Sequence, residues 1–234
     1  MPIHIQAENG QVAPTVLLCG DPDRARTIAE NHLTGVQCIN RHRQLLGFTG
    51  RCGKLPITVQ TTGMGAPSAA IVVEELIGLG ARRLLRLGTC GAIRPGIALG
   101  DLIAVTAARG ENGVTRELTG EPFALVKAEP RLTAALNDAA AQLELPVHSG
   151  TVASLDLFYD PDPTRVAKLA RGGVLALEME ASAVLLLAAR HGLEAGCLLT
   201  VSDLVAERKR APADVIATGV EHMARVGLTA LGAG

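Results

Sequence analysis

Apolar runs alternate with amphipathic stretches from one end of the chain to the other. Residues 15–19 (TVLLC) have the pattern of a short buried strand, and residues 21–32 open with Asp and Pro, which suit a helix start. A strand that runs into a helix is predicted for residues 175–192 (LALEMEASAVLLLAARHG). By the same criteria we expect further strands over residues 82–88, 101–108, 147–154 and 197–203, and further helices over residues 66–80, 130–145 and 212–231.

One segment departs from this alternation of strand and helix. Residues 45–50 and 55–62 are joined by the sequence RCGK, which predicts a β-hairpin. A hairpin within a mostly β-α-β order implies antiparallel pairs in a mixed sheet. No Ser/Pro-rich linker, low-complexity tract or internal repeat divides the chain. We therefore expect a single α/β domain over residues 1–234, a three-layer α/β/α fold with a central mixed β-sheet.

Composition and charge narrow the classes of partner. Apolar residues make up 48% of the chain and charged residues 19%, and the net charge is -1, which argues against disorder and against binding to nucleic acid or anionic membrane. No apolar run approaches the roughly 18–20 residues of a membrane span, and the N-terminus lacks a signal-peptide pattern, so we expect a cytoplasmic protein. The cysteines show no metal-ligand spacing, so no metal site is predicted. The expected partner is a small molecule or another copy of the chain.

Candidate binding residues lie where predicted strands end in glycine-rich loops, which is where ligands bind in such sheets. Gly20 closes the first strand, and backbone N–H groups at the helix start that follows can face an anion. Arg24 falls in the first helical turn, where a cation opposes the helix dipole by roughly 0.3–1 kcal/mol unless it shares an anion. A solvent-facing arginine is the alternative.

Arg86 interrupts an apolar strand just before a predicted glycine turn. A buried guanidinium needs an anionic partner. With Gly88, Thr89 and Gly91, the turn would place backbone and hydroxyl donors beside Arg86, which suits phosphate. The alternative is a structural salt bridge to a carboxylate of the core.

Two further features stand out in a core built from Leu, Val, Ala and Ile. Phe158 and Tyr159 are adjacent in a loop, where they would either stack on a flat ligand or anchor the loop. Glu178 and Glu180 lie two residues apart in a pattern that reads as buried, and they share a face if the strand is still extended there. Glu178 would either support Glu180 or pair with an arginine.

Several segments form a series along the chain: PIHIQAENG near the start, GDPDRA (20–25), RQLLGFTG, TTGMGAPSAAIVVEEL, RLGTCGAI (86–93), SLDLFY (154–159), LEMEASA (177–183) and TVSD (200–203). In this order and spacing they resemble the nucleoside phosphorylase family. That family includes hexameric bacterial purine nucleoside phosphorylases, uridine phosphorylases and methylthioadenosine phosphorylases. The resemblance spans nearly the whole chain.

The resemblance implies three groups of site residues. The phosphate site would consist of Gly20, Arg24, Arg86 and Thr89, completed by Arg43 from a neighbouring subunit. The ribose site would consist of His4, Met64, Met179 and Glu180, with His4 also coming from the neighbour and touching the 5′ end. The base site would consist of Cys90, Gly91, Phe158, Leu177 and Asp203. Glu180 would accept hydrogen bonds from the 2′- and 3′-hydroxyls of ribose.

The implied activity is reversible phosphorolysis of purine (deoxy)ribonucleosides to free base and (deoxy)ribose 1-phosphate. Inorganic phosphate is a co-substrate, and no metal or organic cofactor is required. A protonated Asp203 would donate to N7 of the leaving purine; a helix cap is the alternative role for this residue. Active sites shared between subunits imply an obligate dimer, and the purine members imply a hexamer built as a trimer of dimers.

Two positions depart from the purine enzymes. Ile216 stands where an arginine assists the catalytic acid, and Arg208, Lys209 or Arg210 would have to substitute for it. Leu155 stands where the purine enzymes often carry a smaller residue, which implies a base pocket of a different shape.

Other activities remain as alternatives. Uridine phosphorylases share GDPDR and the Thr of RLGT, but they read uracil with a Gln and an Arg, and this chain has Arg165 without the Gln. Methylthioadenosine phosphorylases share the acid and need an apolar 5′ pocket, whereas His4 favours a 5′-hydroxyl. A nucleoside hydrolase would not need the arginines at positions 24, 43 and 86. A non-catalytic nucleoside sensor would not need Asp203.

Overall fold

The computed structural model describes residues 2–232 of the chain. Its strands are β1 (Thr15–Cys19), β2 (Thr34–Asn40), β3 (Gly47–Cys52), β4 (Leu55–Thr61), β5 (Arg83–Ala92), β6 (Leu102–Glu111), β7 (Leu125–Lys127), β8 (Val147–Leu155), β9 (Ala176–Glu178), β10 (Glu194–Leu204) and β11 (Lys209–Arg210). Its helices are α1 (Pro22–His32), α2 (Ala66–Gly78), α3 (Gly113–Thr119), α4 (Pro130–Gln142), α5 (Arg165–Arg171), α6 (Ala181–Arg190) and α7 (Ala213–Ala230), with a short 3-10 turn η1 (His42–Gln44).

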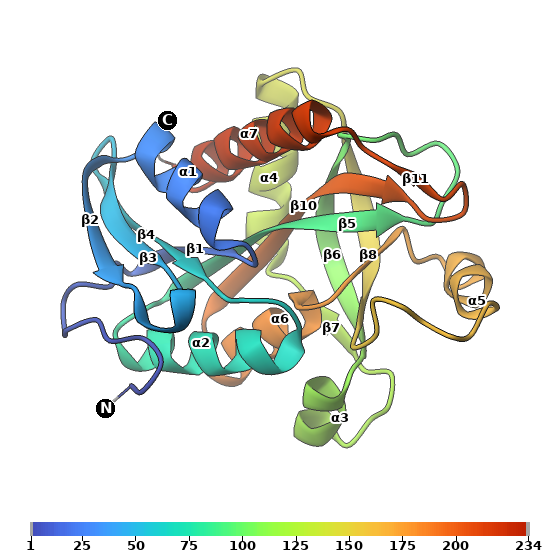
Figure 1. Ribbon diagram of the computed structural model, residues 1–234, viewed down its shortest axis with the longest axis horizontal. Helices are drawn as coiled ribbons and strands as arrows, with labels where there is room; N and C mark the ends of the chain where they lie inside the picture. The colour runs from blue at the N-terminus through green and yellow to red at the C-terminus, as the bar shows by residue number, and fades with distance from the viewer. Residues whose placement is uncertain (1, 233–234) are drawn as a thin grey trace.

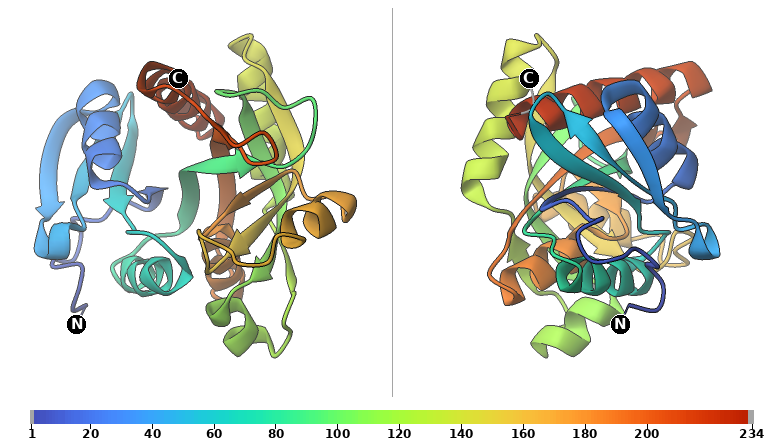
Figure 2. Two further views of the ribbon diagram at one scale, coloured as in Figure 1. Left: turned by 45° about the vertical axis from the view of Figure 1, so that its right-hand side comes forward. Right: turned by 90° about the vertical axis from the view of Figure 1, so that its left-hand side faces the viewer.

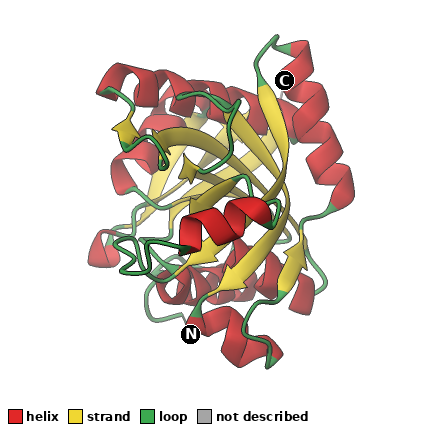
Figure 3. Cartoon of the chain, turned by 90° about the vertical axis from the view of Figure 1, so that its right-hand side faces the viewer, coloured by secondary structure: helices red, strands yellow, loops and turns green. Residues whose placement is uncertain are grey.

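The strands of the described chain form one mixed sheet, in the order β11-β10-β6-β8-β9-β5-β1-β4-β3-β2, with β7 paired to β6. Because β5 also pairs with β10, the pairings of β5, β9, β8, β6 and β10 close into a ring. The strands β1 to β4 extend the sheet away from this ring (Figures 1 and 2), and Figure 3 views the molecule from the side on which the ring lies. The ring brings β5, β9 and β10, which are far apart in sequence, into direct contact.

Helices cover both faces of the sheet. Helices α1, α4 and α7 lie on one side, and α2 and α6 lie on the other (Figures 1 and 2). Each side has its own apolar cluster. Val73 of α2 packs in one cluster with Leu84 of β5, and Leu85 of β5 belongs to the other cluster with Met223 of α7. Successive residues of β5 therefore face opposite layers, and the predicted three-layer α/β/α fold with a mixed sheet is confirmed.

Local sequence explains where α1 begins. The side chain of Asp21 accepts a hydrogen bond from the backbone N–H of Arg24 at 2.7 Å, and Pro22 occupies the first helical position. The predicted hairpin is also present, since β3 and β4 pair in antiparallel fashion across a tight turn. Arg24 is thereby held in the first turn of α1, as the sequence predicts.

The prediction of a glycine turn after residue 88 is wrong. Strand β5 continues to Ala92, and Gly88 lies inside it. A Cβ at Gly88 would lie 2.7 Å from Nη2 of Arg86 and 3.0 Å from Cδ2 of Leu199. The glycine makes room for a guanidinium rather than for a turn. Thr89 is therefore a strand residue, paired with Thr200 of β10.

Candidate active site

A buried cluster of charged side chains lies where β5, β9 and the start of α6 meet. Arg86 of β5 is 3% exposed, and its Nη2 lies 2.5 Å from Oε2 of Glu180 and 3.1 Å from Oε2 of Glu178. Burial alone would lower the pKa of Arg86, but the charges of Glu180 and Glu178 raise it above its ordinary value. The salt bridge to core carboxylates, one of the two alternatives for Arg86, is therefore present.

Glu178 anchors this cluster to the start of α6. Its Oε2 accepts hydrogen bonds from the backbone N–H groups of Glu180 at 2.9 Å and Ala181 at 2.8 Å, which are otherwise unpaired donors of a helix N-terminus. The same oxygen accepts from Nε of Arg86 at 3.1 Å, and Oε1 accepts from the hydroxyl of Ser154 in β8. Glu178 thus sets the positions of Arg86 and Glu180 at the same time.

Glu180 receives one protein donor at each carboxylate oxygen. Oε1 accepts from the backbone N–H of Gly65, at the start of α2, at 2.5 Å, and Oε2 accepts from Arg86. Burial raises the pKa of Glu180, the charge of Arg86 opposes the rise, and the charge of Glu178 adds to it, with a net upward direction. Each carboxylate oxygen has two lone pairs, so Glu180 can accept further hydrogen bonds from a diol.

The positive charges of Arg24 and Arg86 act on the same buried thiol, that of Cys19. Burial raises the pKa of Cys19, the last residue of β1, to about 11, and the positive charges of Arg24 and Arg86 both oppose that rise. Cys19 directly precedes Gly20 and the start of α1. Within residues 2–232, Nη1 of Arg86 is buried and has no hydrogen-bond partner. A guanidinium N–H and a second arginine at a helix N-terminus can together bind an anion.

Three residues of the predicted base site line up across neighbouring strands. Gly91 of β5 pairs with Leu177 of β9 on one side and with Asp203 of β10 on the other. Cys90, the residue before Gly91, is buried. Burial raises the pKa of its thiol, the charges of Glu178 and Asp203 raise this pKa further, and the charge of Arg86 lowers it. The row therefore lies next to the cluster formed by Arg86 and the two glutamates.

Asp203 follows an irregularity in β10, where the register against β5 shifts between Val201 and Asp203. Such a bulge re-aims a side chain. Its Oδ2 accepts from the hydroxyl of Ser202 at 2.7 Å, and its Oδ1 accepts from Nη1 of Arg210 at 3.3 Å. Arg210 is thus the basic candidate that contacts Asp203, with which it pairs in register on β11. The interpretation of Asp203 as a helix cap is wrong, because it lies within β10 and α7 begins only at Ala213.

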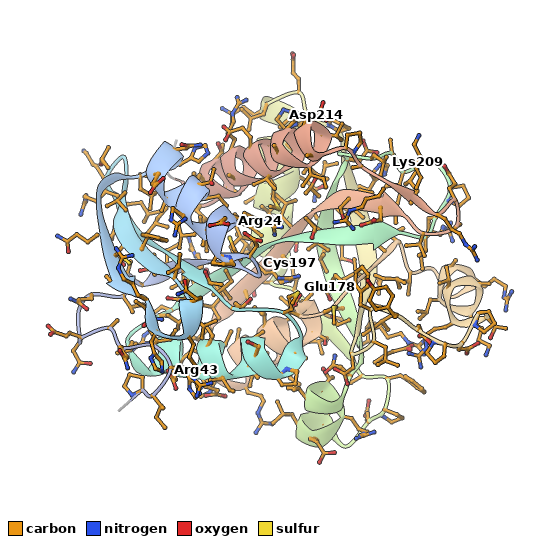
Figure 4. The ribbon with its side chains drawn as sticks, in the orientation of Figure 1. Arg24, Arg43, Glu178, Cys197, Lys209 and Asp214 are labelled. Atoms are coloured by element: carbon orange, nitrogen blue, oxygen red, sulfur yellow. The ribbon has the colours of Figure 1, made fainter. Side chains whose placement is uncertain are left out.

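The two residues predicted to act across a subunit boundary lie together at the surface. His4 and Arg43 line one hollow with Gly63 and Ser68. In Figure 4 Arg43 lies at the η1 turn, away from Arg24 near the middle of the molecule. That placement suits residues that are offered to a neighbouring subunit.

The remaining predicted residues surround the cluster without joining it. Met64 is 83% exposed and Phe158 is 67% exposed, and the Phe158 ring packs edge-on against Tyr159 with 5.0 Å between ring centres. Thr89 is half-buried in β5. Met179 lies between the two glutamates in the chain and is half-buried. Of these four, Met179 is the one that directly adjoins residues of the charged cluster in the chain.

Three residues that sequence reasoning did not assign take part in this geometry. Ser154 hydrogen-bonds to Glu178, Ser202 hydrogen-bonds to Asp203, and Glu75 binds the N-terminal segment that carries His4. Both serines lie in segments that carry the family resemblance, SLDLFY and TVSD, and a polar residue at the end of an apolar strand was the available signal. No sequence signal pointed to Glu75, because a glutamate in an amphipathic helix is normally a surface residue.

Two kinds of feature are absent from residues 2–232. No group of three or more His, Cys, Asp or Glu side chains in that range is placed to hold a metal ion. No helix in the same range is long and apolar enough to cross a bilayer.

Known proteins resemble this chain over nearly its full length. The family described as Phosphorylase superfamily matches residues 14–231. The chain is 42% identical over 229 residues to a protein from Bacillus subtilis (strain 168) named purine nucleoside phosphorylase DeoD-type, a match that covers 97% of this chain and 98% of that protein. Proteins of the same name from Alkaliphilus metalliredigens (42% identical, 87% and 88% covered) and Colwellia psychrerythraea (39% identical, 86% and 86% covered) are also similar. With this coverage and the site described above, the chain belongs to the phosphorylase superfamily, the nucleoside phosphorylase family that its motifs resemble.

Proposed function

We propose that this chain is a purine nucleoside phosphorylase, a pentosyltransferase that converts a purine (deoxy)ribonucleoside and inorganic phosphate reversibly into free base and (deoxy)ribose 1-phosphate. The observation that carries the proposal is the buried contact of Arg86 with Glu180, together with Asp203 near the end of β10, the strand that pairs with β5. The charges of Arg86 and Asp203 both act on the thiol of Cys90, which lies between them along β5 and β10. Support comes from the relatives named purine nucleoside phosphorylase, which match as much as 98% of the chain.

Phosphate and ribose meet at the Arg86 cluster in this mechanism. Nη1 of Arg86, the side chain of Arg24 and the backbone at Gly20 bind phosphate, which attacks C1′. A bond forms between a phosphate oxygen and C1′ while the C1′–N9 bond breaks. Glu180 accepts hydrogen bonds from the 2′- and 3′-hydroxyls, and its negative charge stabilises the oxocarbenium-like transition state.

The leaving base takes the bonding electron pair and needs a proton. We assign the donor to Asp203, which gives its proton to N7. The Ser202 hydroxyl and the Arg210 guanidinium hold the carboxyl group, and Arg210 stabilises the carboxylate that remains after the transfer. The chemistry requires inorganic phosphate as co-substrate and no metal or organic cofactor.

The loop after β8 supports a purine rather than uracil as the base. Nη1 of Arg165 lies 3.0 Å from Oδ2 of Asp160, and its Nε lies 3.8 Å from Oε2 of Glu111. Glu111 is also bound by Arg109 at 2.6 Å. Because two carboxylates already engage Arg165, its guanidinium is not available to bind a uracil carbonyl. The residue that would favour a uridine phosphorylase is therefore occupied.

We also propose that the enzyme is a cytoplasmic hexamer, built as a trimer of dimers with shared active sites. The surface positions of His4 and Arg43 support sharing. An apolar groove between α2 and α3, lined in part by Ile71, Val114 and Leu118, offers contact area for another subunit. Sedimentation velocity of the purified protein should give the mass of six chains, and a fully active monomer would contradict the shared site.

The activity is tested by base release from inosine, adenosine, uridine and methylthioadenosine, each with and without phosphate. We expect release from inosine or adenosine only when phosphate is present, because the arginines of the site bind the attacking phosphate. Uridine should give little or no uracil. Prior treatment with EDTA should leave the rates unchanged.

Each alternative activity has its own signature in the same assay. Phosphate-independent release would indicate a hydrolase, and faster release from uridine would indicate the uridine branch. A preference for methylthioadenosine would move the chain to that branch of the family. Nucleoside binding without any release would support a non-catalytic sensor.

A further inference from the structure

Glu75 of α2 holds the N-terminal segment in place. Its carboxylate accepts hydrogen bonds from the backbone N–H groups of Ile3 at 3.0 Å, His4 at 2.9 Å and Ile5 at 2.7 Å. The imidazole Nδ1 of His4 lies 2.8 Å from Oε1 of the same carboxylate. One partly buried side chain therefore orders both the backbone and the ring of His4.

The segment is also tied to the loop that carries Arg43. The side chain of Asn40 accepts from the backbone N–H of Gln6 at 3.0 Å and donates to the backbone oxygens of His4 at 3.3 Å and Leu45 at 2.6 Å. Asn40 thus links the segment of His4 to the loop that carries Arg43, and His4 and Arg43 line a single surface hollow.

Glu75 determines which imidazole nitrogen of His4 carries the proton. Burial acts to raise the pKa of Glu75, but hydrogen bonds from the His4 side chain and from the backbone of residues 3–5 lower it more, and the net shift is downward. A carboxyl with a lowered pKa stays ionised at neutral pH, and an ionised carboxylate only accepts hydrogen bonds. The Nδ1 of neutral His4 must therefore carry the proton, which leaves Nε2 with a lone pair.

An imidazole with a lone pair on Nε2 accepts a hydrogen bond from a hydroxyl group. It forms no hydrogen bond with a thioether or a methyl group, because these groups have no proton to donate and Nε2 has none either. We propose that Glu75 is a positioning residue that holds His4 as an Nε2 acceptor and thereby selects nucleosides with a 5′-hydroxyl over their 5′-deoxy and 5′-methylthio analogues. This rests on the proposed function, in which His4 faces the ribose 5′ end. A site built to accept a hydroxyl proton rejects the analogue that lacks it, because the acceptor is left unpaired.

The test compares adenosine with 5′-deoxyadenosine in wild type, Glu75→Gln and Glu74→Gln. The Glu75→Gln amide no longer imposes one tautomer, so kcat/KM for adenosine should fall roughly tenfold while that for 5′-deoxyadenosine changes little. Glu74→Gln is the matched control, because the neighbouring Glu74 pairs with His191 at 2.9 Å on the exposed side of the same helix. Glu74→Gln should keep the wild-type ratio of kcat/KM for adenosine to kcat/KM for 5′-deoxyadenosine. An unchanged ratio in Glu75→Gln would overturn the proposal.

A second variant covers the case in which Glu75→Gln does not fold. His4→Ala leaves the three backbone hydrogen bonds to Glu75 in place, and it should lose the same preference for the 5′-hydroxyl. Preference retained in His4→Ala would overturn the proposal. If wild type released no base from either substrate, the proposed function itself would fail, and the proposal would fall with it.

The tautomer can be measured without any activity. In the wild-type protein at about pH 8.5, where imidazoles are normally neutral, the ¹⁵N spectrum should show His4 protonated at Nδ1 and unprotonated at Nε2. The His4→Ala spectrum assigns the signal. A His4 ring protonated at Nε2 would overturn the proposal even if the enzyme is a phosphorylase.

Discussion

Replacing Arg86 with methionine is expected to lower the free energy of unfolding by about 3–5 kcal/mol, the usual cost of removing one partner of a buried ion pair. The guanidinium is 3% exposed and lies against two carboxylates. Methionine is of similar length, but it leaves Glu178 and Glu180 buried without a counter-charge. Urea denaturation followed by circular dichroism measures the loss.

The loss should also depend on pH. Burial is the main cause that raises the pKa of Glu180, and Arg86 is the charge that opposes it most. A group whose folded pKa is raised stabilises the folded state fully below its unfolded pKa, and this contribution is lost as the pH rises through the folded pKa. Without Arg86 the pKa of Glu180 rises further. The difference in stability between variant and wild type should therefore be larger at about pH 8 than at about pH 5.5.

Arg83 provides the matched control on the same strand. It pairs with Glu194 at 2.7 Å, but its side chain is 39% exposed, so Arg83→Met should cost no more than about 1 kcal/mol. Adding Glu178→Gln and Glu180→Gln to Arg86→Met should recover part of the stability, because both uncompensated charges are then gone. Equal losses for the two arginine variants would mean that the buried charges are not the cause.

The need of Arg86 for an anion could be predicted from sequence, but its partners could not. One charge in an apolar strand is a local signal, as are the Asp and Pro that start α1. Glu178 and Glu180 lie 92 and 94 residues further along the chain, and phosphate or a core carboxylate satisfies the same charge equally well. Only the tertiary structure shows that two carboxylates are present, with one guanidinium nitrogen left over.

The ring of strands was beyond sequence reasoning for a related reason. The strand and helix predicted over residues 175–192 are present as β9 and α6. Strand β9 has only 3 residues, however, and nothing in so short a segment shows that it pairs with both β5 and β8. Elements β7, β11, α3 and α5 are similarly short and were not predicted. Gly88 was assigned to a turn because an isolated glycine usually marks one, whereas its actual role depends on the side chain of Arg86 packed against it.

The basic partner of Asp203 shows how strand register decides between equal candidates. Positions 208, 209 and 210 all carry basic residues, and nothing in their order favours one of them. The antiparallel pairing of β10 with β11 places Arg210 directly opposite Asp203, while Lys209 pairs with Leu204. Ile216, at the position where the purine enzymes place an arginine, lies instead in the first turns of α7. In this chain the guanidinium that contacts Asp203 therefore comes from β11.

Replacing Asp203 with asparagine is expected to lower kcat for inosine or adenosine by about 10²–10⁴-fold, the usual contribution of a general acid. The amide can still donate a hydrogen bond to N7, but it cannot transfer a proton. KM should therefore change little. The side chain is 27% exposed near the end of β10, so the variant should remain folded. Steady-state kinetics with each nucleoside separates the two parameters.

A nucleoside methylated at N7 isolates the proton transfer from other roles of Asp203. Its base is already cationic and leaves without an acid, so wild type and Asp203→Asn should cleave it at similar rates. Arg210→Met keeps the acid but removes the donor 3.3 Å from its Oδ1, and it should lose roughly tenfold on ordinary purines and little on the methylated one. If Asp203→Asn loses the same factor on both nucleosides, Asp203 acts in binding rather than as the acid. If Arg210→Met keeps the full rate, its contact with Asp203 is a surface ion pair without a part in catalysis.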